Sequence, residues 1–265
     1  MSPRDIVEEV GKYLEIVTVR EPRDRATMWH ASDLCAHCGW CKIYGEPGPF
    51  CPRKLDPGKI LLSPQGWGPA RNIVSFTGGD LLCRPRFYVE TFRAIKREYG
   101  DEVWIHVETN GYGLTDKNLE LLYEAGLDSV WLDMKAFSED IYRMLCGTTN
   151  RWILDLPAKI RDLGIVLEVV LLYIPSLVEL DEFRKFAELL VNVDPYIPTM
   201  ILAFFPEYML RHVREPTYEE IVQAYRVLKS YGLKNVKIGN VSVVCRDVEC
   251  VKKLIEEVGR ESVAL

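Results

Sequence analysis

The chain has 265 residues, of which 48% are hydrophobic and 27% are charged, so it is long enough for one globular domain with a sizeable core. A formal net charge of −6, a pI near 5.4 and the lack of any long run of lysine or arginine argue against a nucleic-acid-binding protein. No apolar stretch reaches membrane-spanning length, and the charged N-terminus lacks a signal-peptide core. We therefore expect a cytoplasmic protein with no membrane partner.

Short β-rich runs alternate with helical stretches along most of the chain. The predicted strands are Ala26–Ala31, Asn72–Thr77, Val103–Glu108, Ser129–Met134, Val166–Leu172 and Met200–Phe205. The predicted helices are Phe87–Glu98, Asp116–Ala125, Ile153–Leu163, Glu179–Leu190 and Tyr218–Ser230. This alternation predicts βαβ units and a parallel sheet, which is either doubly wound or an incomplete barrel. In both folds the active residues gather at the carboxyl ends of the strands.

Local signals mark the ends of several helices and one irregular segment. Thr115 and Thr217 have the character of helix N-caps, whereas Gly126, Gly164 and Gly232 fall where C-caps belong. Between Lys42 and Ala70 the chain is rich in proline and glycine, which predicts a long irregular loop.

Three cysteines directly follow the first predicted strand, at positions 35, 38 and 41 of LCAHCGWC. Soft thiolate ligands at this spacing suit an iron–sulfur cluster or zinc. Cys51, which precedes a proline, leaves two alternatives open. In one, four cysteines close a structural cluster or zinc site, and in the other, three cysteines hold a metal with one position left open for chemistry.

Polar and glycine-rich motifs follow the other predicted strands. These are TGGD at 77–80, ETNG at 108–111, LDMK at 132–135 and FFPEY at 204–208. Because parallel strands end at the same edge of a sheet, the motifs predict one site built from several loops. Gly78 and Gly79 allow close approach of the backbone to a ligand, and Asp80 can accept hydrogen bonds from a ligand amino group.

These motifs, in this order and followed by LEVVLLYIPSLVE, resemble the radical S-adenosylmethionine (SAM) enzymes. The resemblance runs from about Ala26 to Tyr208 and is strongest to the pyruvate formate-lyase activating enzyme-like branch. It implies an α/β fold with parallel strands in a partial (β/α)6 TIM-like barrel. The corresponding boundaries are an N-terminal extension at 1–25, a core at 26–210 with its cluster loop at 32–53, and a C-terminal segment at 211–265 that packs on the core.

The resemblance also implies the cofactors and the residues that bind them. Cys35, Cys38 and Cys41 would ligate a [4Fe-4S] cluster whose fourth iron is chelated by SAM. Reductive cleavage of SAM would then yield a 5′-deoxyadenosyl radical that abstracts a hydrogen atom from the substrate. The residues expected to face or line the SAM pocket are Gly78, Gly79, Asp80, Glu108, Asn110, Asp133 and Lys135. No side chain is assigned as catalytic.

The chain departs from the family pattern at three points. Two residues instead of three separate Cys35 from Cys38, Asp80 stands where glutamate is commoner, and FFPEY lacks a histidine that activating enzymes often carry. The expected function is therefore a radical SAM enzyme, either a glycyl-radical enzyme activase or a modifying enzyme for a small molecule or another macromolecule. A four-cysteine electron-transfer or structural metal protein is the alternative from another class. A flavodoxin- or ferredoxin-like donor and a glycyl-radical enzyme are the partners that the resemblance implies.

The remaining cysteines and aromatic residues have simpler interpretations. Cys51 is taken as a free or structural thiol, and Cys83 and Cys146 as core residues. Cys245 and Cys250 are open to a disulfide, a shared metal or free thiols. His106, Trp104 and Trp131 are expected to be core residues, and Trp40 to shield the cluster. His37 either tunes the cluster or is a solvated loop residue. Lys135 is expected to relieve repulsion among Glu108, Asp133 and the SAM carboxylate.

Overall fold

The computed structural model describes residues 2–17, 20, 44–46, 60–63, 66–80 and 82–264. The predicted strand Ala26–Ala31 lies outside the described residues. So do Cys35, Cys38, Cys41 and Cys51, together with His37 and Trp40.

The main sheet has six strands in the order β3-β4-β5-β6-β7-β8. Their bounds are β3 Ile73–Phe76, β4 Trp104–Thr109, β5 Ser129–Met134, β6 Val166–Tyr173, β7 Thr199–Ala203 and β8 Val236–Gly239. The pairs β3–β4, β6–β7 and β7–β8 are parallel. A doubly wound sheet reverses its strand order at a switch point, whereas this order follows the chain throughout, as in (β/α) barrels. The predicted α/β class with parallel strands is therefore confirmed, and the strand order is that of a partial (β/α)6 barrel.

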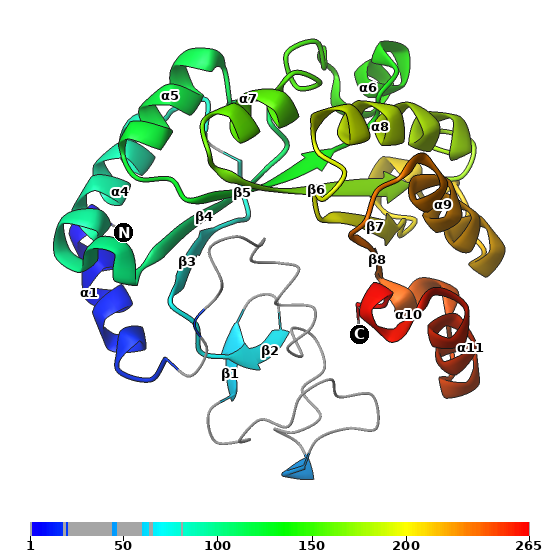
Figure 1. The fold of residues 1–265 in the computed structure, drawn as a ribbon, viewed down its shortest axis with the longest axis horizontal. Helices are drawn as coiled ribbons and strands as arrows, with labels where there is room; N and C mark the ends of the chain where they lie inside the picture. The colour runs from blue at the N-terminus through cyan, green and yellow to red at the C-terminus, as the bar shows by residue number, and fades with distance from the viewer. Residues whose placement is uncertain are drawn as a thin grey trace. The chain divides into compact units, whose positions relative to one another are not determined.

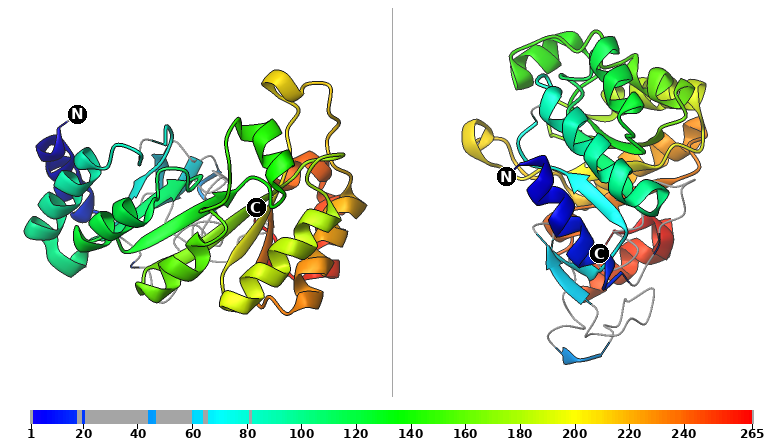
Figure 2. Two further views of the ribbon diagram at one scale, coloured as in Figure 1. Left: turned by 90° about the horizontal axis from the view of Figure 1, so that it is seen from above. Right: turned by 90° about the vertical axis from the view of Figure 1, so that its left-hand side faces the viewer.

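The chain forms two compact units. The first contains the residues up to Trp131 with Asp162–Val166, and the second contains Leu132–Arg161 and Leu167–Ala264. In the first unit, helices α1 (Pro3–Leu14) and α4 (Arg86–Tyr99) lie side by side (Figures 1 and 2), and the Tyr99 hydroxyl donates to the Val7 carbonyl at 2.8 Å. Helix α5 (Asp116–Glu124) follows β4.

Strand β3 and helix α4 share an aromatic core in the first unit. The ring centroid of Phe76 lies 5.0 Å from that of Phe92 and 5.8 Å from that of Tyr88. At the other end of α4, the Lys96 ammonium donates to Asp128 at 2.7 Å and to the Val103 carbonyl at 2.9 Å. These contacts fix α4 against β4 and its neighbouring loop through both burial and charge.

The remaining helices lie, in chain order, between the strands of the second unit and after the last of them. Their bounds are α6 Glu139–Cys146, α7 Leu156–Asp162, α8 Leu180–Val193, α9 Tyr218–Tyr231, α10 Val241–Val244 and α11 Val248–Val258. Helices α8 and α9 pack against each other (Figure 1), and Phe183 and Phe186 of α8 are fully buried. Thr217 caps α9 through a capping box with Glu220, as predicted, and Gly232 ends α9 with φ 111°.

Several elements were not predicted from the sequence. These are strand β8 and helices α1, α6, α10 and α11. Strand β8 and helix α10 have four residues each and offer little periodicity, whereas α1 and α11 have 12 and 11 residues and lie outside the βαβ pattern on which the prediction was based. The segment expected to be irregular contains an antiparallel hairpin of β1 (Ile60–Ser63) and β2 (Gly66–Pro69). The prediction of a wholly irregular Lys42–Ala70 is therefore wrong, because Gly66 and Pro69, read as loop signals, lie within an isolated two-stranded pair.

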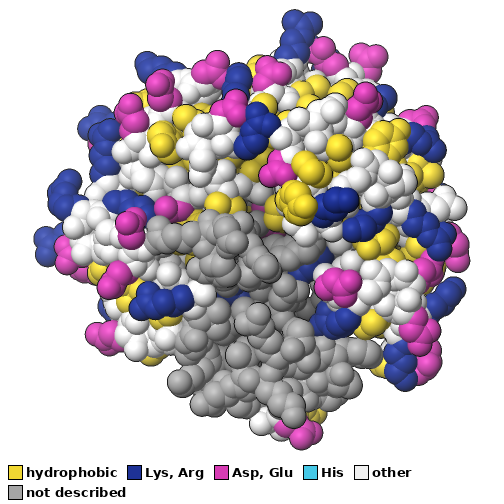
Figure 3. All heavy atoms as spheres, in the orientation of Figure 1, with side chains coloured by type: hydrophobic (Ala, Val, Ile, Leu, Met, Phe, Trp, Pro, Cys, Tyr) yellow, Lys and Arg dark blue, Asp and Glu magenta, His cyan; other side chains and the backbone are white. Residues whose placement is uncertain are grey.

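Basic and acidic side chains are interspersed over the described part of the face drawn in Figure 3. No helix among the described residues has both the length and the apolar character needed to cross a membrane.

Candidate functional site

The TGGD loop, Thr77–Asp80, leaves β3 with an open backbone. Gly78 has φ 97°, which L side chains rarely adopt, and a Cβ added at Gly78 or Gly79 would meet no atom of the described residues within 4 Å. Both glycines are exposed. No described residue therefore covers the open side of these glycines, and the close approach of a ligand to their backbone stays a prediction.

Asp80 connects this loop to the loop that follows β4. One carboxylate oxygen accepts hydrogen bonds from the Thr109 hydroxyl at 2.7 Å and the Asn110 amide at 2.9 Å. The other accepts from the Leu82 amide at 3.3 Å. The predicted bond from Asp80 to a ligand amino group stays a prediction, and the structure adds a second role, that of holding two loops together. Thr109, which enables this role, was not singled out from the sequence.

We expect Asp80→Ala to lower the free energy of unfolding by about 2 kcal/mol, because three donors lose a charged acceptor. Thr109→Val removes one of those donors with little change of shape. If Asp80 acts on SAM only through the loops, Thr109→Val will weaken SAM binding about as much as Asp80→Ala. If its carboxylate binds SAM directly, Asp80→Ala will cost about tenfold more affinity, measured by calorimetric titration.

Glu108 stands at the end of β4 beside β3. The Thr77 hydroxyl donates a short hydrogen bond to its carboxylate, and the Ser75 hydroxyl lies 3.5 Å from the other oxygen. Thr77, Gly79, Asp80 and Glu108 border a pocket of only about 10 Å³, which is room for roughly one water molecule. A larger ligand at this loop would therefore contact the open face of Gly78 and Gly79 instead of this pocket.

We expect Gly79→Ala to leave the free energy of unfolding within about 0.5 kcal/mol of wild type, since the added Cβ meets no atom of the described residues within 4 Å. The same methyl would occupy the space in which a ligand approaches the backbone, so SAM binding should weaken about tenfold or more. Gly113→Ala is the contrasting control, because its Cβ would lie 2.4 Å from the Cys83 nitrogen and should cost stability. Unchanged SAM affinity in a folded Gly79→Ala would contradict the assignment of this loop.

In the second unit, Asp133 and Lys135 form an ion pair around the end of β5. The Lys135 ammonium bonds one oxygen of Asp133, and both side chains are about one-third exposed. The other oxygen of Asp133 is buried and has no hydrogen-bond partner among the described residues. A buried carboxylate oxygen without a donor fits a ligand that brings an N–H or O–H group.

A buried carboxylate from α8 holds the segment directly after Lys135. Glu182 is 3% exposed, and one oxygen accepts from the amides of Phe137 and Ser138 at 2.7 and 2.8 Å. The other accepts from the Ser138 hydroxyl and from the Lys185 ammonium at 2.9 Å. Glu182 was not identified from the sequence, because its donors lie 44 and 45 residues away.

His106 is a buried core residue, as expected. Its Nδ1 lies 2.8 Å from the Ser129 hydroxyl, and complete burial lowers its pKa to about 3. The imidazole is therefore neutral at pH 7. Its Nε2 is buried without a partner among the described residues. Trp104 is 1% exposed, which confirms its predicted packing role.

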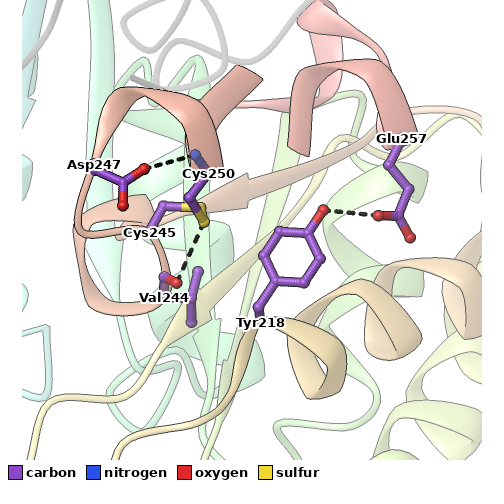
Figure 4. Close-up of a disulfide and its surroundings, with 6 residues drawn as sticks. All are labelled: Tyr218, Val244, Cys245, Asp247, Cys250 and Glu257. Atoms are coloured by element: carbon purple, nitrogen blue, oxygen red, sulfur yellow. Dashed lines mark hydrogen bonds between the residues drawn. A yellow bond between two sulfur atoms is a disulfide. The ribbon is translucent and has the colours of Figure 1, made fainter. Parts of the chain in front are cut away.

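Cys245 and Cys250 form a disulfide between the end of α10 and the first turn of α11 (Figure 4). Of the three alternatives that the sequence left open for these two cysteines, the structure shows the disulfide. Cys83 and Cys146 are free and exposed, so their prediction as core residues is wrong. Cys83 lies in the turn before α4 and Cys146 is the last residue of α6, where the chain turns toward solvent. The described residues contain no group of three or more histidine, cysteine or acidic side chains able to hold a metal.

Comparison with known proteins places the chain in a family. The family model of the radical SAM superfamily matches residues 35–190, more than half of the chain. A candidate glycyl-radical enzyme activating enzyme of Methanocaldococcus jannaschii is 29% identical over 137 residues, covering 50% of this chain and 51% of that protein. The pyruvate formate-lyase-activating enzyme of Clostridium pasteurianum is 28% identical over 123 residues, covering 45% and 48%. The chain thus spans about half the length of these two relatives.

Two further comparisons agree. The pyruvate formate-lyase 1-activating enzyme of Escherichia coli (strain K12) is 26% identical over 176 residues, covering 61% of this chain and 69% of that protein. A domain of pyruvate-formate lyase-activating enzyme from Bacteroides vulgatus ATCC 8482 has the same fold, with a TM-score of 0.54 at 18% identity, covering 63% of this chain and 98% of that chain. The chain therefore belongs to the radical SAM superfamily and is an enzyme of that superfamily.

Proposed function

We propose that this enzyme cleaves SAM reductively at a [4Fe-4S] cluster held by Cys35, Cys38 and Cys41, and that it activates a glycyl-radical enzyme. The observation that carries the proposal is the family match, which begins at Cys35, includes the motifs at 77–80, 108–111 and 132–135, and ends at residue 190 within α8. Cys35, Cys38 and Cys41 would hold the cluster, which would supply the electron needed for reductive cleavage of the SAM sulfonium.

The described residues fit the SAM side of such a site. Gly78 and Gly79 present open backbone to the methionyl group, and Asp80 holds their loop against Asn110. In the second unit, the unpartnered oxygen of Asp133 offers an acceptor for a ligand N–H or O–H, while Lys135 neutralises the same carboxylate. Glu108, bonded by Thr77, completes the proposed set of lining residues.

The names of three similar proteins support the activase assignment, since they are activating enzymes for glycyl-radical enzymes and pyruvate formate-lyase. The protein substrate would then be a glycyl-radical enzyme, and a flavodoxin- or ferredoxin-like carrier would supply the electron. The absence of a histidine in FFPEY favours a second candidate, a modifying enzyme that acts on a small molecule or another macromolecule.

An anaerobic turnover experiment tests the proposal. Protein reconstituted with iron and sulfide is mixed with SAM and dithionite, and methionine and 5′-deoxyadenosine are quantified by liquid chromatography. We expect both products in equal amounts. Normal iron–sulfur content with neither product would indicate the electron-transfer alternative. Appearance of a glycyl radical signal in a co-expressed partner would separate the activase from the modifying enzyme.

A further inference from the structure

The outward face of α4 and the turn before it carry an unusual concentration of arginine. Arg86, Glu90 and Arg93 follow one another at helical spacing, and Arg84 precedes the helix by two positions. Arg84, Arg86 and Arg93, which we name the arginine patch, border a depression of about 360 Å³. Its apolar walls are formed by Pro85, Val89 and Leu121.

Most of this positive charge is not neutralised within the described part of the chain. Glu90 pairs with Arg86 at 2.8 Å, whereas Arg84 and Arg93 have no ion-pair partner among the described residues. All three arginines are exposed. Their charges therefore face solvent, on a chain whose net charge is −6.

Two of the three arginines lie at an end of α4 where a cation is unfavourable. Arg84 precedes the helix and Arg86 is its first residue, and the first turn has no acidic residue. The amino end of a helix already carries partial positive charge, so a cation there costs about 0.3–1 kcal/mol. The pair with Glu90 offsets this cost for Arg86, but not for Arg84, for which attraction of an anionic partner is the better explanation.

The form of the depression favours a protein over a small molecule. Small-molecule sites enclose most of the ligand and place a few buried polar groups against it. Here the charged side chains that line the depression are exposed, and its other lining residues are apolar. Apolar residues together with several arginines are typical of a protein–protein interface. The partner that it fits has an acidic surface.

The patch also lies close to the proposed SAM loop along the chain. Arg84 is only five residues after Gly79, so their Cα atoms are at most about 17 Å apart. If the proposed function is right, the cofactors bind beside Gly78 and Gly79, and this surface is within short reach of them.

We propose that the arginine patch is the docking surface for the electron donor, an acidic, low-potential one-electron carrier protein of the flavodoxin or ferredoxin type. The inference rests on the proposed function. In the step that it serves, the reduced carrier loses one electron and the enzyme's oxidised cluster gains it. No atom is transferred, and the patch only brings the two proteins together.

The test compares a protein donor with a chemical one. Full-length, reconstituted Arg84→Glu/Arg93→Glu is assayed for SAM cleavage with reduced flavodoxin, with reduced ferredoxin and with dithionite, which needs no docking surface. We expect the rate with the effective carrier to fall at least tenfold at low salt, and the rate with dithionite to stay within twofold of wild type. The wild-type rate with the carrier should also fall steeply with added salt, and that of the variant should not.

Two further variants make the result specific. Arg184→Glu/Lys234→Glu reverses two exposed charges in the second unit and should behave as wild type with every reductant. Arg84→Gln/Arg93→Gln should give an intermediate loss. The proposal is overturned if the control variant loses as much carrier-driven activity, if the patch variant loses none, or if it loses dithionite-driven activity to the same extent.

A direct binding measurement tests the docking surface independently of the proposed function. Interferometry with oxidised flavodoxin and ferredoxin at low salt requires no turnover. Binding to wild type that is lost in Arg84→Glu/Arg93→Glu would support the docking surface even if no SAM were cleaved. Turnover with dithionite but no binding of either carrier to wild type would refute the docking surface and leave the proposed function intact.

Discussion

Alanine at Cys35, Cys38 or Cys41 is expected to abolish SAM cleavage and to remove most of the cluster. Each thiolate is proposed as one of three protein ligands, and a [4Fe-4S] cluster held by only two cysteines is poorly retained. The measurements are iron and sulfide content, the visible absorbance of the anaerobic protein, and the yield of 5′-deoxyadenosine. We expect product below the detection limit in all three variants.

Cys51→Ala distinguishes a cluster held by three cysteines from one held by four. A cluster with one iron left open for SAM needs no fourth cysteine, so this variant should keep its cluster and turn over at a rate within a few-fold of wild type. Cys83→Ala, at an exposed free thiol, is the matched control and should change nothing. Loss of the cluster in Cys51→Ala would mean that four cysteines close the site, and the proposed mechanism would fall.

Glu182→Gln is expected to lower the free energy of unfolding by about 3 kcal/mol. Glu182 is buried and its carboxylate accepts from two amides, one hydroxyl and one ammonium. In the variant, the NH₂ group of glutamine would face N–H or O–H donors in place of an acceptor oxygen. The Lys185 ammonium would also lose its negatively charged partner. Chemical denaturation measures the change, and Glu188→Gln on the exposed face of α8 should stay within about 0.5 kcal/mol of wild type.

The effect of Glu182 should also depend on pH. Burial by itself raises the pKa of this carboxyl, but the hydrogen bonds from Ser138, Lys185 and Phe137 outweigh burial and lower the pKa below its ordinary value of 4.5. A lowered pKa in the folded state stabilises the protein above pH 4.5, and that stabilisation is lost as the pH falls further. The difference between wild type and Glu182→Gln should therefore shrink between about pH 5 and pH 3. If the stability difference between wild type and Glu182→Gln is the same at pH 5 and pH 3, the lowered pKa of Glu182 is not its cause.

The hydrogen bonds of Glu182 should affect SAM binding as well as the stability of the fold. Glu182 bonds the amides of Phe137 and Ser138, which follow Lys135 by two and three residues. Loosening this segment should weaken SAM binding in Glu182→Gln even at a temperature where the variant is folded. The pair Asp133 and Lys135 would then be correctly placed only while α8 holds the chain that follows them.

The regular elements could largely be read from the sequence, since hydrophobic periodicity and caps are local. The prediction Ser129–Met134 coincides with β5, and those for β3, β4, α4 and α9 end within one residue of the observed bounds. Strand-end motifs in a fixed order identified the family. Strand β8 (VKIG) was missed, because a lysine interrupts its apolar run and a glycine ends it.

What the sequence determined by itself was the α/β class, the parallel strands and the superfamily, because these depend on residue types at short, regular spacing. Only the tertiary structure decided how the side chains of the site are used. Asp80 bonds Thr109 at a separation of 29 residues, and Glu182 bonds Phe137 at a separation of 45. Such contacts arise when the packing of helices on the sheet brings distant loops together, and no local pattern encodes which donor meets which carboxylate.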